Sequence, residues 1–222
     1  MTRILEPLSL IRVLYSFKGR FQNFAERLAH FSLTANHATF GGAFFSAATA
    51  ASFYIGLRVF SCALLLVPFC LFLRLIMNAL DGLLARAHGN ASATGEILNE
   101  LSDVVGDTVC YGVLFFVFPE LHGEVSGVLL AIWFAEFVGV LGKSLPGGKR
   151  RQESVAGGKP ERAVLFGGFA IAYFIHPLEV QSVRLFLCLL AFLTILTGLR
   201  RIQMAIREAR AKKYVSVTEF GR

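Results

Sequence analysis

The stretch NALDGLLARAHGNASATGEILNELSD, residues 78–103, decides both the fold and the candidate chemistry of this chain. It brings Asn78, Asp81, Arg86 and Asp103 into a sequence that is otherwise strongly apolar. Polar and ionisable side chains at membrane depth are costly, so they are retained mainly where they serve a function. We therefore interpret this stretch as the centre of a functional site.

Long apolar runs dominate the rest of the chain. Of its 222 residues, 55% are hydrophobic and 22 are Phe, and the mean hydropathy is +0.61. Such runs are typical of membrane spans, so the sequence predicts an all-α integral membrane protein. Residues 1–222 are predicted to form a single domain, because the spans follow each other closely without a linker rich in Pro and Ser.

Six membrane-spanning helices are predicted between residues 36 and 200. They cover residues 36–57, 60–84, 96–118, 123–142, 162–179 and 183–200. Residues 1–33 have apolar side chains at every third or fourth position with basic side chains between them, which predicts an amphipathic interfacial helix. Residues 201–222 are predicted to form a basic cytoplasmic tail.

Lysine and arginine are distributed unevenly among the connections. They cluster before the first span, between the fourth and fifth, and after the sixth, whereas the alternate connections have few. The positive-inside rule then predicts that both termini and the loop containing Arg86 are cytoplasmic, in the inner membrane of a cell. Anionic lipid headgroups account for the net charge of +7, and no nucleic-acid partner is expected.

The polar residues of the 78–103 stretch fall on two helical faces. Steps of three and four residues return to the same side of a helix, which groups positions 78, 81, 82, 85 and 86. The connection to the next helix is short, so the two helices are expected to be antiparallel neighbours around a cytoplasm-facing cleft with oxygen ligands on both walls. The candidate ligands for Mg²⁺ or Mn²⁺ are Asn78, Asp81, Asn99, Asp103 and Asp107.

This spacing resembles the signature of the class I CDP-alcohol phosphatidyltransferases, D-x-x-D-G-x-x-A-R followed after eight residues by G-x-x-x-D-x-x-x-D. The matching positions are Asp81, Gly82, Ala85, Arg86, Gly95 and Asp103. Thr34-Ala35-Asn36 is similar to the Thr-Pro-Asn that often opens the first span of the family. The resemblance extends to the six spans and the amphipathic N-terminal helix.

Asn78 and Asn99 depart from the signature, because they stand where the family has its first and third Asp. In this respect the chain resembles a minor branch of the family with the same Asn pattern. Amide oxygens can ligate a hard cation, but they lack the negative charge of a carboxylate. The site is therefore expected to bind metal more weakly or to hold fewer ions. Asp107, one turn beyond Asp103, or Glu100 is a candidate to restore a carboxylate.

The resemblance implies that the phosphatidyl group of a CDP-activated lipid, CDP-diacylglycerol, is transferred to an alcohol with release of CMP. It implies that Asp81, helped by Asn78 and Asn99, holds metal against the diphosphate, and that Asp103 is the general base. The implied nucleotide-binding residues are Gly82, Ala85, Arg86, Gly95 and Asn36. A homodimer is also implied, and the sequence offers small-residue surfaces at residues 41–42 and 47–51.

The acceptor alcohol is less defined by the sequence. Arg151, Lys159 and Arg162 lie near the predicted cleft mouth and suit a phosphorylated alcohol such as glycerol 3-phosphate or an inositol phosphate. A purely topological role for these charges is an equal alternative, and a neutral acceptor such as serine or a polyol stays open. Glu136 is predicted to line the acceptor pocket, whereas Arg74 is expected to form a structural bridge with Glu136.

Two other functions compete with the transferase. The first is a family member that binds nucleotide-lipid without turnover, because two ligand positions are neutral. The second is a small transporter or channel subunit. The lack of an obvious internal repeat and the grouping of carboxylates near one membrane face argue against the second.

Overall fold

The computed structural model describes residues 34–87, 93–144 and 154–219, and these segments are helical with short turns between them. The long helices are α3 (Ala35–Arg58), α4 (Leu66–Ala87), α5 (Ala93–Gly112), α7 (His122–Leu141), α8 (Lys159–Ile175) and α9 (Val180–Glu219). The short ones are η1 (Ser61–Leu65), α6 (Leu114–Val117), η2 (Pro119–Leu121) and η3 (Gly142–Ser144). The predicted amphipathic helix at residues 1–33 lies outside the described residues.

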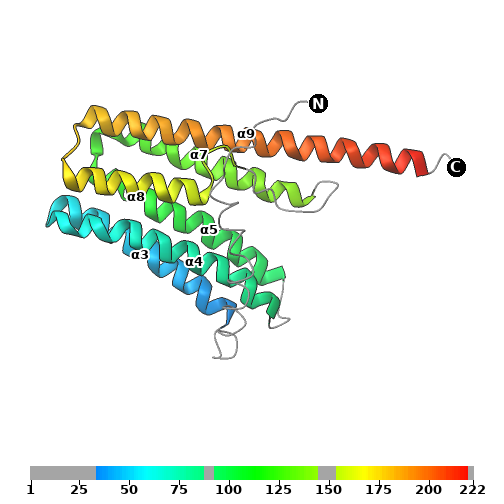
Figure 1. Cartoon of the computed structure of the whole chain (residues 1–222), viewed down its shortest axis with the longest axis horizontal. Coiled ribbons are helices and arrows are strands. Elements are labelled where there is room, and N and C mark those ends of the chain that lie inside the picture. The colour runs from blue at the N-terminus through cyan, green and yellow to red at the C-terminus, as the bar shows by residue number, and fades with distance from the viewer. Residues whose placement is uncertain (1–33, 88–92, 145–153, 220–222) are drawn as a thin grey trace.

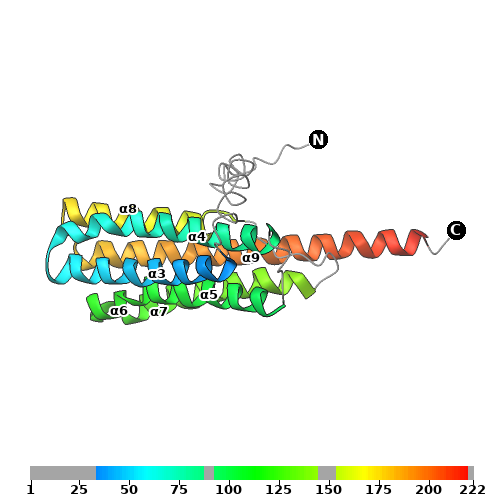
Figure 2. The same ribbon diagram turned by 90° about the horizontal axis from the view of Figure 1, so that it is seen from below.

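The long helices form an up-and-down bundle (Figures 1 and 2). α3 packs along α4, α7 packs along α9, α5 contacts both α3 and α7, and α8 contacts α4. The ends of α3 and α4 at Ala35 and Ala87 and the start of α5 at Ala93 lie at one end of the bundle, from which α9 projects (Figure 1). The cytoplasmic location predicted for both termini and for the loop containing Arg86 stays a prediction.

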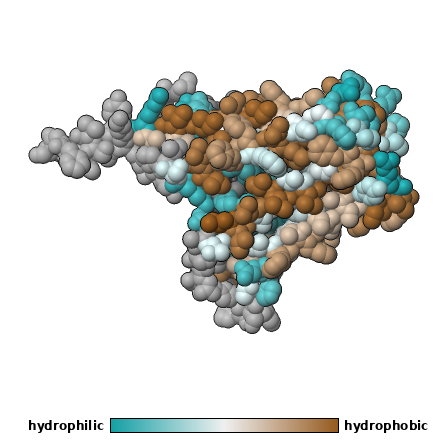
Figure 3. Space-filling model, turned by 180° about the vertical axis from the view of Figure 1, so that it is seen from behind, coloured by the Kyte–Doolittle hydropathy of each residue, from teal (hydrophilic) through white to brown (hydrophobic). Residues whose placement is uncertain are grey.

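The surface of the bundle is apolar, as a lipid-facing surface must be. Large hydrophobic side chains are exposed along the helices, including Phe44, Phe72, Phe137 and Phe192, and Figure 3 shows a broad hydrophobic face. Among the residues that the structure describes, four segments are long and apolar enough to cross a membrane: Ala35–Arg58, Ser61–Leu84, Pro119–Ser144 and Val180–Arg210. The predicted membrane class is thereby supported, while the number of six spans stays a prediction.

Several predicted spans differ from the observed helices. The span at 60–84 begins with η1 before α4, and the span at 183–200 lies within the longer α9. The span at 96–118 is divided into α5 and α6, which meet after Gly112, a residue of low helix propensity. α8 begins at Lys159, three residues earlier than predicted, with Pro160 in its first turn, where the missing N–H of proline costs no helical hydrogen bond. Pro68 likewise falls in the first turn of α4.

Thr34 caps the first described helix. Its hydroxyl accepts from the His37 backbone N–H at 3.5 Å, and His37 Nδ1 accepts from the Thr34 backbone N–H at 3.1 Å. Asn36 lies exposed in the turn that this capping box holds. The cap therefore sets the point at which α3 begins beside α4.

The glycine pair predicted as a self-association surface packs within the chain. A Cβ at Gly41 would lie 2.9 Å from Met77 Sδ, and a Cβ at Gly42 would lie 2.6 Å from Asn78 Oδ1. Gly41 and Gly42 therefore allow α3 to approach α4 closely. The homodimer stays a prediction without this pair to support it.

Candidate active site

Asn78 and Asp103 join α4 to α5. The Asn78 side-chain amide donates to Asp103 Oδ1 at 2.8 Å. Asp103 is only 4% exposed, so this carboxylate is held inside the bundle. The predicted pairing of the two signature helices is therefore present, with the first variant position of the signature in contact with its last matching Asp.

Asp81 lies one turn along α4 from Asn78, and it is also buried. Its Oδ2 accepts a hydrogen bond from the Thr39 hydroxyl of α3 at 2.6 Å. The Asp81 carboxylate is therefore held by a residue of α3, whereas Asp103 is held by a residue of α4. A metal site shared by Asp81 and Asp103 stays a prediction.

Lys159, the first residue of α8, reaches the same carboxylate. Its ammonium group forms an ion pair with Asp103 Oδ2 and lies 3.8 Å from Glu136 Oε2. The two oxygens of Asp103 therefore receive different donors, an amide on one and an ammonium on the other. Lys159 and Glu136, both predicted at the acceptor pocket, lie next to the predicted general base.

Asp107 and Arg162 lie in a buried ion-pair network. Asp107 accepts from Arg74 at its Oδ1 and from Arg162 at its Oδ2, both at 2.6 Å. Arg162 is fully buried, and it also donates to Gly157 O at 2.8 Å and to Glu136 Oε1 at 3.2 Å. This arrangement favours structural roles over the predicted metal role of Asp107 and acceptor role of Arg162.

Arg74 was expected to bridge to Glu136, but the partner that the structure gives it is Asp107. Glu136 instead pairs with Arg162 and Lys159 of α8 and with Arg201 of α9, whose NH1 lies 3.7 Å from Oε1. Glu100 pairs with Lys143 at 3.0 Å. This geometry gives Glu100 an interhelical ion pair rather than a place beside Asp103.

The other predicted site residues are placed to different extents. Asn99 lies half-buried one turn before Asp103, Gly82 is half-buried, and Gly95 is exposed in the first turn of α5. Ala85 and Arg86 belong to α4, but their side chains fall outside the described part of the structure, as does Arg151. Their predicted roles in binding nucleotide and acceptor stay predictions.

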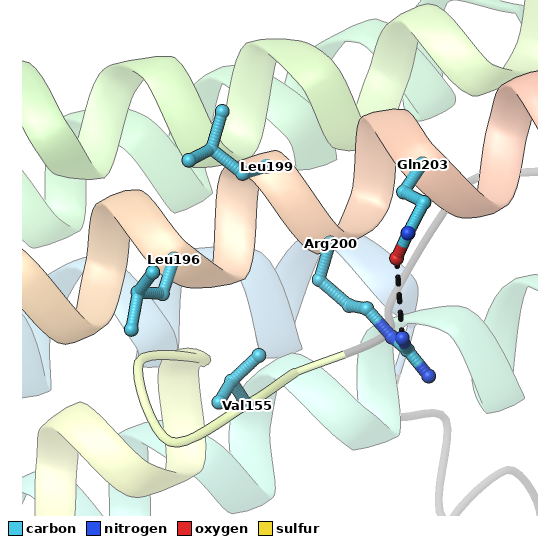
Figure 4. Close-up of a pocket in the computed structure, with 5 residues that line it drawn as sticks. All are labelled: Val155, Leu196, Leu199, Arg200 and Gln203. Carbon is cyan, nitrogen blue, oxygen red and sulfur yellow. Dashed lines mark hydrogen bonds between the residues drawn. The ribbon is translucent and has the colours of Figure 1, made fainter.

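A surface hollow of about 380 Å³ lies between the segment before α8 and α9 (Figure 4). It is lined by Val155, Leu196, Leu199, Arg200 and Gln203, none of which belongs to the predicted site. Arg200 donates to Gln203 Oε1 at 3.2 Å along α9. The predicted cytoplasm-facing cleft between α4 and α5 is a separate feature and stays a prediction.

Three residues of the site region were not predicted from the sequence. Thr39 binds Asp81, Arg201 donates to Ala135 O at 2.5 Å beside Glu136, and Thr197 accepts from the backbone of Gly157 at 3.1 Å. A hydroxyl within an otherwise apolar span was the available signal for Thr39 and Thr197. Arg201 could not be distinguished from the basic residues that set topology.

The residues present fit a hard divalent cation in part. Asp81, Asn78, Asn99 and Asp103 offer two carboxylates and two amides, and oxygen ligands of this kind suit Mg²⁺ or Mn²⁺. Within residues 34–87, 93–144 and 154–219, no three His, Cys, Asp or Glu residues group as metal ligands. A metal here would therefore depend on the amides or on oxygens supplied by a substrate.

Residues 32–206 match the family model of the CDP-alcohol phosphatidyltransferases, and the chain belongs to this family. It is 33% identical over 204 residues to the Escherichia coli K12 inner membrane protein YnbA. The matched residues cover 87% of this chain and 96% of that protein. The family assignment confirms the predicted resemblance. It makes the chain a membrane phosphotransferase of phospholipid metabolism rather than a transporter.

Solved structures of Mycobacterium tuberculosis phosphatidylinositol phosphate synthase (PgsA1) have the same fold. The structure with CDP-DAG bound has a TM-score of 0.63 at 20% sequence identity, over 83% of this chain and 92% of that one. The structure in complex with manganese and citrate has the same score and identity, over 83% and 88%. These similarities place the helices of this chain in the arrangement of that synthase.

Proposed function

We propose that this protein transfers the phosphatidyl group of CDP-diacylglycerol to the hydroxyl of an alcohol and releases CMP. The observation that carries the proposal is the direct contact of Asn78 with Asp103 across α4 and α5, with Asp81 one turn away. These positions belong to the two halves of the family signature. The CDP-DAG bound to the similar synthase supports the choice of donor.

Asp103 is the proposed general base. The acceptor hydroxyl gives its proton to the Asp103 carboxylate while its oxygen attacks the lipid-side phosphorus, and the bond from that phosphorus to the CMP oxygen breaks. The hydrogen bond from Asn78 to Oδ1 orients the carboxylate, and the Lys159 ammonium pairs with its other oxygen. A base in this role contributes typically about 10²–10⁴-fold to the rate.

Asp81, Asn78, Asn99 and Asp103 are the residues that would hold Mg²⁺ or Mn²⁺. The ion would supply positive charge to the diphosphate and to the leaving CMP. Thr39 orients Asp81 through its hydroxyl at 2.6 Å. Gly82, Ala85, Arg86, Gly95 and Asn36 are proposed for the nucleotide by their signature positions.

A phosphorylated alcohol is the proposed acceptor class. Lys159 places a half-buried ammonium directly beside the proposed base, where it can attract an acceptor phosphate and bring the hydroxyl to Asp103. Glu136, 3.8 Å from that ammonium, keeps Lys159 aimed at the site. Arg162 contributes indirectly, because it holds Asp107 and Glu136 in place.

The test is release of CMP by purified protein given CDP-diacylglycerol, Mg²⁺ or Mn²⁺, and a panel of alcohols. The panel contains glycerol 3-phosphate, an inositol phosphate, their unphosphorylated counterparts and serine. We expect CMP release with a phosphorylated member and loss of release in Asp103→Asn. CDP-diacylglycerol binding without release for any acceptor would support the non-catalytic alternative, and absence of binding would refute the proposed function.

A further inference from the structure

The carboxylates that would bind a metal already have donors from this chain. Asp103 receives the Asn78 amide at Oδ1 and the Lys159 ammonium at Oδ2, and Asp81 Oδ2 receives the Thr39 hydroxyl. A divalent cation entering the nucleotide-free protein must compete with these donors. The competition is most severe at Lys159, because two positive charges would then share one carboxylate.

The charges of the surrounding network point in the same direction. Its cations are Arg74, Lys159, Arg162 and Arg201, and its carboxylates are Asp103, Asp107 and Glu136. Within these ion pairs four cations face three carboxylates, so the paired carboxylates do not lack positive charge when no metal ion is bound. Asp81 and Glu161 are further buried carboxylates outside these ion pairs. Positions 78 and 99 hold neutral amides and add no negative charge.

A diphosphate would change this balance. It adds negative charge and phosphate oxygens, which Mg²⁺ prefers to combine with one or two protein carboxylates rather than with a cage made of protein alone. An incoming phosphate also offers the Lys159 ammonium an alternative anionic partner. Nucleotide and metal therefore relieve each other's unfavourable charge at this site.

We propose that the divalent cation binds this protein more tightly when the nucleotide diphosphate is bound than when it is absent. Lys159 is the positioning residue that imposes this coupling, because it occupies Asp103 when no nucleotide is present. The inference rests on the proposed function, since it takes the CDP-lipid as the ligand. Linkage requires the coupling to be reciprocal: the factor by which CDP-lipid strengthens Mn²⁺ binding equals the factor by which Mn²⁺ strengthens CDP-lipid binding.

The experiment measures Mn²⁺ binding by electron paramagnetic resonance of free Mn²⁺, using the purified full chain in detergent with and without CDP-diacylglycerol. We expect the lipid to raise Mn²⁺ affinity at least about tenfold, within the usual range of coupling between sites. Titration of CDP-diacylglycerol with and without Mn²⁺ should give the same factor. Equal Mn²⁺ affinity in both states would overturn the inference.

Variants then test the role of Lys159. Lys159→Met should raise the Mn²⁺ affinity of the nucleotide-free protein and reduce the coupling factor, whereas Lys159→Arg should preserve the coupling. The matched control is Lys143→Met, which removes a lysine that pairs with Glu96 and Glu100 away from Asp103, and it should change neither quantity. An unchanged factor in Lys159→Met would refute the role of this lysine.

A second variant makes the test independent of the folding of Lys159→Met. Asn78→Asp adds a carboxylate and should let the nucleotide-free protein bind Mn²⁺; weak binding in this variant would contradict the charge argument. If CDP-diacylglycerol binds at no Mn²⁺ concentration, the proposed function itself fails. Tight Mn²⁺ binding to the nucleotide-free wild type would instead overturn the coupling between metal and nucleotide, and it would leave the proposed function standing.

Discussion

Gly42 of α3 lies directly against the side chain of Asn78 in α4, so that a Cβ at position 42 would come within 2.6 Å of Asn78 Oδ1. The same Asn78 donates through its other amide atom to Asp103. A glycine on one helix therefore defines where the amide on the next helix can lie. The orientation of the proposed base depends in turn on that amide.

We expect Gly42→Ala to reduce the rate of CMP release, because the added methyl group must displace Asn78 from Asp103. Small displacements of catalytic groups can cost roughly a hundredfold in rate, and a loss of about tenfold or more is expected here. The control is Gly41→Ala, whose methyl group would meet the flexible thioether of Met77 at 2.9 Å. Equal effects of the two changes would contradict the role given to Asn78.

Asp103→Asn should lower the rate of CMP release by about 10²–10⁴-fold, the usual contribution of a general base. The variant keeps the shape of the side chain but cannot take the acceptor proton. This variant should still bind CDP-diacylglycerol, as measured by titration with a labelled lipid. A variant with near wild-type turnover would remove Asp103 from the mechanism.

Asp107→Ala tests the buried network. The change leaves the guanidinium groups of Arg74 and Arg162 without their shared carboxylate, and breaking a buried ion pair on one side costs about 3–5 kcal/mol. The free energy of unfolding in detergent should fall by that order. Glu96→Ala, at an exposed pair with Lys143, should change it by at most about 1 kcal/mol. A stable Asp107→Ala protein with altered metal affinity would instead restore the metal role predicted for Asp107.

Gly157→Ala should disturb the start of α8. A Cβ at Gly157 would lie 2.4 Å from the Leu193 carbonyl oxygen and 2.5 Å from Thr194 Cα, so the backbone before α8 would have to move away from α9. Lys159 follows two residues later, and the coupling between CDP-lipid and Mn²⁺ should weaken with it. Gly168→Ala, inside α8, is the control, since a methyl group there meets nothing within 4 Å.

The sequence predicted the membrane class, the family and the pairing of α4 with α5, because each depends on local patterns. Apolar runs indicate spans, and the short connection between Ala87 and Ala93 makes neighbours of the helices that contain Asn78 and Asp103. Helical spacing then placed Asn78 and Asp103 on faces of α4 and α5 that contact each other. These features need no knowledge of how distant helices pack.

The partners across the bundle could not be predicted in the same way. Arg74 meets Asp107, and Glu136 meets Arg162 and Arg201, because these contacts depend on the rotation and crossing of helices far apart in sequence. Lys159 and Arg162 are one turn apart on α8, yet the first is half-buried beside Asp103 and the second is enclosed completely. Charge and spacing alone gave both residues the same role.

α9 runs from Val180 to Glu219 without interruption, about 60 Å of helix, which is twice the thickness of the hydrocarbon core of a bilayer. Arg201 ties its middle to Ala135 and Glu136. If α9 tilts about this contact, its end moves farther than its middle. A fluorophore attached near Glu219 would therefore report the tilt. A change in its position on addition of substrate would report events at the buried charges from the far end of α9.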